Sequence, residues 1–82
     1  MSAIVAANLV RKAVRLLAES KEHHDAGRPS WGRAVARDAE RLLRDANALH
    51  STTETVRLLI DALDLSGRIE ESGVREVPRV SA

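Results

Sequence analysis

The break between two long helical segments constrains this chain more than any other feature. The segments are separated by four residues, Ala26-Gly27-Arg28-Pro29. Gly27 suits the left-handed backbone position just past a helix, and Pro29 cannot continue a helix that began before it. Because so short a connection forces neighbouring helices to fold back on each other, the sequence predicts an antiparallel helical hairpin. The two helices are expected over about 3–25 and 31–50.

A third, shorter helix is expected over about 52–66. Ser51 followed three residues later by Glu54 has the spacing of a capping box, and Gly67 is the expected stop. Ser30 is the expected cap of the second helix. The predicted fold class is therefore all-α, a hairpin plus a third helix in a three-helix bundle, with residues 1–67 as its single domain.

The remaining residues, 68–82, combine β-branched side chains with Pro78 and are expected to form an extended C-terminal arm. The arm is either a frayed tail or a segment that lies across a neighbouring subunit. It could also fold back and cover apolar side chains of its own chain.

Size and composition restrict how such a domain can be stabilised. A chain of 82 residues is one domain, near the size where a single core supplies only a few kcal/mol. It has no cysteine, which excludes disulfides and thiolate metal sites, and Trp31 stands without any Phe or Tyr. The core must therefore consist of Leu, Val, Ile and Ala.

The charge balance and the hydrophobic segments limit the partners. The formal net charge is +1, from 13 basic and 12 acidic residues, which argues against a nucleic-acid binder driven by bulk charge. Arginine outnumbers lysine eleven to two, a bias typical of a GC-rich bacterial or phage genome. The apolar stretch at the start is too short to span a bilayer and does not resemble a signal peptide. We expect a cytoplasmic protein with no membrane contact.

The apolar faces of the helices differ in width. At about 100° per residue, the second helix has one narrow apolar seam, whereas the other two helices are apolar around half of their circumference or more. A three-helix monomer cannot readily cover that surface, so we expect a homodimer or higher assembly, or another protein as partner. The expected seam is Trp31, Val35, Ala39, Leu42, Ala46 and Leu49, and the expected interface residues are Val5, Leu9, Leu16, Leu58 and Leu65.

A row of arginines on the second helix is the most visible candidate for binding an anion. Its spacing of four, four and three residues places all members on one face, opposite the seam, where phosphates or an acidic partner could reach them. The alternative is a solvated face on which Asp38, Glu40 and Asp45 neutralise the row through ion pairs along the helix. The row is Arg33, Arg37, Arg41 and Arg44.

The end of the second helix and the third helix could also form a degenerate helix-turn-helix. However, His50 stands where the turn usually has glycine, and the exposed face of the third helix has Glu54, Asp61 and Asp64 against Arg57. These residues give the face a net charge of −2, so phosphates would repel it. DNA binding would then have to use the arginine row or the arm.

The histidines show no catalytic or metal-binding pattern. His23 and His24 are adjacent, so on a helix they diverge by about 100° and cannot hold one metal together. His50 beside Ser51 lacks a third orienting group. We therefore expect no enzyme, no cofactor and no metal.

The sequence leaves three functions open. The first is a self-associating helical protein-interaction module that acts as a regulator or assembly factor. The second is a small nucleic-acid-binding transcriptional regulator, and the third is a structural component of a phage particle.

Overall fold

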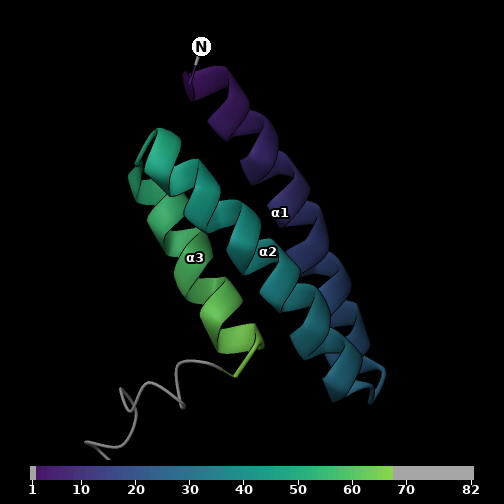
Figure 1. Ribbon diagram of the computed structural model, residues 1–82. Helices are drawn as coiled ribbons and strands as arrows, with labels where there is room; N and C mark the ends of the chain where they lie inside the picture. Colours follow the sequence, from purple (N-terminus) through teal and green to yellow (C-terminus); the bar gives the residue numbers. More distant parts are fainter. Residues whose placement is uncertain (1, 68–82) are drawn as a thin grey trace, which may run out of the picture.

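The computed structural model describes residues 2–67, and the predicted arm lies outside the described residues. These residues form three helices: α1 (Ser2–Asp25), α2 (Pro29–Leu49) and α3 (Thr53–Leu65). The described part of the chain contains no strand, which confirms the all-α class. In Figure 1, α2 runs back along α1 and α3 then lies along the other side of α2. Packing is most extensive between α1 and α2, and α1 also contacts α3.

The turn between α1 and α2 is a Schellman motif. Gly27 has a φ of 79°, the Gly27 amide donates to the His24 carbonyl at 3.1 Å, and the Arg28 amide donates to the His23 carbonyl at 2.8 Å. The predicted cap at Ser30 is wrong, because α2 already begins at Pro29 and has Arg28 at its N-cap without a side-chain cap. Proline suits the first helical position because its φ is fixed there and no amide hydrogen is needed.

The turn between α2 and α3 is capped one residue later than the sequence suggests. Thr52, rather than Ser51, is the N-cap of α3, and its hydroxyl accepts a hydrogen bond from the Thr55 amide at 3.0 Å. At the other end the predicted stop is confirmed: Gly67 has a φ of 79°, and its amide donates to the Asp64 carbonyl at 3.1 Å.

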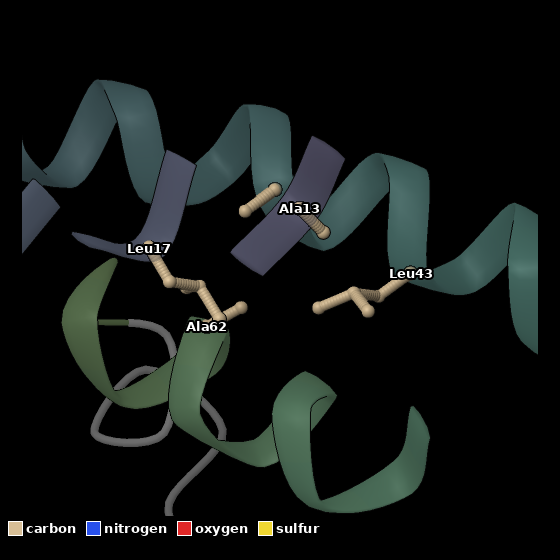
Figure 2. Close-up of a cluster of buried hydrophobic side chains, with 5 residues drawn as sticks. Ala13, Leu17, Leu43 and Ala62 are labelled. Atoms are coloured by element: carbon tan, nitrogen blue, oxygen red, sulfur yellow. The ribbon is translucent and has the colours of Figure 1, made fainter. Parts of the chain in front are cut away.

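The core of the described residues is built mainly from alanine. Figure 2 shows its centre, where Leu17 of α1 and Leu43 of α2 extend toward Ala62 of α3. Of the eight buried hydrophobic residues, six are alanines, and Leu43 is the largest side chain that is completely buried. Small side chains let helices approach closely, but they remove little apolar area from water. The alanines are Ala6, Ala13, Ala36, Ala39, Ala46 and Ala62.

A polar contact joins the three helices near the α1–α2 turn. The Ser20 hydroxyl donates to the Gly32 carbonyl at 2.6 Å, which ties α1 to α2. The His24 ring lies against Gly32, so closely that a Cβ built there would be 2.6 Å from ring atom Cδ2. His24 Nε2 is also 3.0 Å from the Leu65 carbonyl oxygen at the end of α3. A side chain at position 32 would therefore force the His24 ring to move.

The buried face of α2 shares only Ala39 and Ala46 with the predicted seam. Trp31 and Leu49 are exposed at 65% and 44%, and Val35 and Leu42 are only half-buried. Because α2 packs against both α1 and α3, its buried face turns toward its smaller side chains, and the larger seam residues lie at the edge. The buried residues of α2 are Gly32, Ala36, Ala39, Glu40, Leu43 and Ala46.

Candidate functional site

The half-exposed apolar side chains of the hairpin form two matching stripes. The stripe on α1 repeats at intervals of four and seven residues, and the stripe on α2 repeats at four, seven and seven. At about 100° per residue, each stripe falls within roughly 40° of arc on its helix. We call the two stripes together the open flank. It consists of Val5, Leu9 and Leu16 on α1 and Trp31, Val35, Leu42 and Leu49 on α2.

Contacts at the hairpin turn place both stripes on the same side of the molecule. The ring centroids of His23 and Trp31 are 5.5 Å apart, and His23 continues the α1 stripe seven residues beyond Leu16. Leu16 and Leu42 both pack against the edge of the core. The stripes therefore adjoin along the length of the hairpin.

The third helix covers the opposite side of the hairpin. Ala7 and Val10, which lie on the other side of α1 from its stripe, line a cleft with Thr52 and Glu54 near the start of α3. Because α3 occupies that side, none of its residues lies over the open flank. The flank therefore remains uncovered within the described residues.

The structure divides the five predicted interface residues between two places. Val5, 50% exposed, and the half-buried Leu9 and Leu16 belong to the open flank. Leu58 and Leu65 pack against the core on α3 and are also half-buried. The exposed large aliphatic residues of α3 are instead Val56 and Ile60. Self-association itself stays a prediction, with its surface now on α1 and α2 rather than on α1 and α3.

The predicted arginine row is fully on the surface. Arg33, Arg37, Arg41 and Arg44 are all exposed. Arg44 forms the predicted ion pair, its Nε donating to Glu40 Oε2 at 2.8 Å. Glu40, however, is only 5% exposed, so it lies beneath the row rather than among the solvated side chains. This burial corrects the prediction of a solvated Glu40.

The cleft between the start of α1 and the start of α3 has a volume of about 260 Å³. Arg11 and Glu54 line it from opposite helices, and the Arg11 guanidinium donates to Asn8 Oδ1 at 3.0 Å. Ala3, Ala6 and Ala7 make up much of the rest. His50, Thr52 and Thr55 complete the lining, and the two threonine hydroxyls are hydrogen-bonded to each other at 2.9 Å at the start of α3.

No family model, curated protein or solved structure matches the chain. Within residues 2–67, no three His, Asp or Glu side chains are grouped so as to hold a metal ion. The helices of the same region include none that is long and apolar enough to cross a membrane.

Sequence reasoning missed Trp31 and Leu49 as exposed residues of the candidate surface. Both belong to the seam that it assigned to the core. The signal that could have found them is the run of small residues Gly32, Ala36, Ala39 and Ala46, of which the last two also belong to the predicted seam. Such a run favours close helix packing and competes with the larger residues for the buried face.

Proposed function

We propose that this chain is a small helical protein-interaction module whose open flank pairs with the flank of a second copy. The single observation that carries the proposal is the distribution of apolar side chains. The core is filled mainly by alanine, whereas Trp31, Leu49 and Val5 are exposed on one side of the hairpin. Association would move these side chains out of water. Each one that becomes fully buried would stabilise the dimer by about 1.5–3 kcal/mol. By binding in this way the module would act as a regulator or assembly factor.

The shape of the flank favours a second hairpin as its occupant. Two antiparallel helices with matching stripes bury those stripes against two more helices in a four-helix bundle. A two-fold symmetric pair uses the same patch on both subunits, so a self-complementary patch suffices. Tryptophan is enriched at the centres of such interfaces.

Charges at the edges of the flank favour one arrangement of the two copies. The exposed Lys12 lies beside the α1 stripe, whereas the exposed Asp38 and Asp45 lie beside the α2 stripe. Because Ser20 lies level with Gly32, Lys12 lies at a height between Asp38 and Asp45. A two-fold axis parallel to the hairpin would set α1 of each copy over α2 of the other. Lys12 would then face the two aspartates of the partner.

The mass in solution tests this proposal. Sedimentation equilibrium across a concentration series should give a mass that rises from 9.0 kDa toward twice that value. Trp31 is the only tryptophan, so its emission should shift to shorter wavelength over the same range as it leaves water. A constant mass of 9.0 kDa at every concentration would defeat the proposal.

Two matched pairs of variants locate the interface. Leu49→Glu on the flank and Val56→Glu on α3 change side chains that are 44% and 42% exposed. Val5→Glu and Ile60→Glu form a second pair, at 50% and 52%. The flank variants should be monomeric and the α3 variants should associate like the wild type. The reverse result would move the interface to α3.

A charge swap tests the arrangement itself. Lys12→Glu should weaken the dimer, because it would place a third carboxylate against Asp38 and Asp45 of the partner. Adding Asp45→Lys should restore association if α1 of one copy lies over α2 of the other. If the double variant associates no better than Lys12→Glu alone, the two copies pair in a different orientation.

A further inference from the structure

We propose that the arginine row of α2 binds the phosphate backbone of a nucleic acid, a second interaction that does not depend on self-association. The row is Arg33, Arg37, Arg41 and Arg44, and it lies on the far side of α2 from the open flank. Both surfaces can therefore be occupied at the same time.

The arginine row keeps most of its positive charge. Within residues 2–67, the ion pair on this row is that of Arg44 with Glu40, and Glu40 lies beneath the surface. Asp38 and Asp45, which could have paired with Arg41 along the helix, lie toward the flank instead and form no ion pair with it. Three guanidinium groups, those of Arg33, Arg37 and Arg41, thus meet solvent without a carboxylate partner in the described part of the chain.

The length of the row matches several successive phosphates of one strand. From Arg33 to Arg44 the helix rises by about 16 Å, at 1.5 Å per residue. Phosphates of one duplex strand follow at about 3.4 Å along the axis, so the row extends over roughly five of them. A guanidinium group binds phosphate oxygens through two parallel hydrogen bonds. Arginines on one face of a helix can therefore contact phosphates of the same strand.

The arginine row on α2, rather than α3, would make the contact. The exposed face of α3 has Glu54, Asp61 and Asp64 against Arg57, so α3 would be repelled from a phosphate backbone. The row on α2 has no exposed acid within it. A row that binds backbone alone positions the protein on nucleic acid without reading its sequence.

The test is fluorescence anisotropy with a labelled DNA duplex at several salt concentrations. Three phosphate contacts predict a log–log salt slope of about −3 and a loss of about 40-fold in affinity between 50 and 200 mM salt. In Arg37→Ala/Arg41→Ala the slope should fall to about −1. The matched control is Arg11→Ala/Arg15→Ala on α1, which removes the same charge from another face and should keep the wild-type slope.

Three results would overturn the proposal. The first is an absence of binding by the wild type at 50 mM salt. The second is an equal loss in both double variants, which would show that net charge rather than the row attracts the DNA. The third is a polyglutamate peptide that binds the row as tightly as the duplex and displaces it, which would assign the row to an acidic protein. Circular dichroism of each variant confirms that the helices are intact.

Discussion

Gly32 in α2 offers the sharpest test of how the three helices are held together. Replacing glycine by alanine inside a helix ordinarily stabilises it by about 1 kcal/mol. Here, however, the new Cβ would lie 2.6 Å from Cδ2 and 2.7 Å from Nε2 of the His24 ring. The ring would have to move by about 1 Å to reach an ordinary contact distance.

The expected net effect is a loss of stability. Crowding a packed site costs about 1–3 kcal/mol, and displacing the ring breaks its 3.0 Å contact with the Leu65 carbonyl oxygen. A hydrogen bond of this kind contributes about 1 kcal/mol. Against the gain in helix propensity, Gly32→Ala should therefore lower the free energy of unfolding by about 1–3 kcal/mol.

A double-mutant cycle isolates the steric cause. In a His24→Ala background the ring is gone, so Gly32→Ala should now stabilise the protein by about 1 kcal/mol. Urea unfolding followed by circular dichroism measures all four proteins, at one fixed concentration because self-association would add to stability. If Gly32→Ala stabilises the wild type as much as the His24→Ala variant, the ring does not fill the space of a side chain.

Two further substitutions test the turns that connect the helices. Thr52→Ala removes the hydroxyl that caps α3 and should cost about 1 kcal/mol in thermal unfolding, whereas Thr53→Ala, one residue into the helix, should cost little; equal costs would contradict the cap assignment. Gly27→Ala forces a side chain into a left-handed conformation and should cost about 1–2 kcal/mol, and an unchanged melting temperature would contradict that turn geometry.

The arrangement of the helices could be predicted from local signals. Gly27 and Pro29 place the first turn, and Gly67 marks the end of α3, because each residue acts through its own backbone. The caps were harder to place. Ser30 and Ser51 have the right chemistry, but α2 already begins at Pro29 with Arg28 as its N-cap, and Thr52 caps α3.

The side chains at the interfaces could not be placed in the same way. Which face of α2 is buried depends on a third helix that approaches from one side, and periodicity along α2 alone contains no record of it. The burial of Glu40 and the exposure of Trp31 follow from that single rotation. The contact between His24 and Gly32 joins residues on different helices, so no spacing within one helix reveals it.

The short turn at Gly27 also restricts which natural insertions and deletions the chain can tolerate. Both stripes of the open flank start beside this turn, at His23 on one helix and Trp31 on the other. One residue added between them would rotate every later position of α2 by about 100°. The stripes would then face different directions, although each helix would remain intact. Length changes in related sequences should therefore be rare at this turn and better tolerated beyond the far ends of the helices.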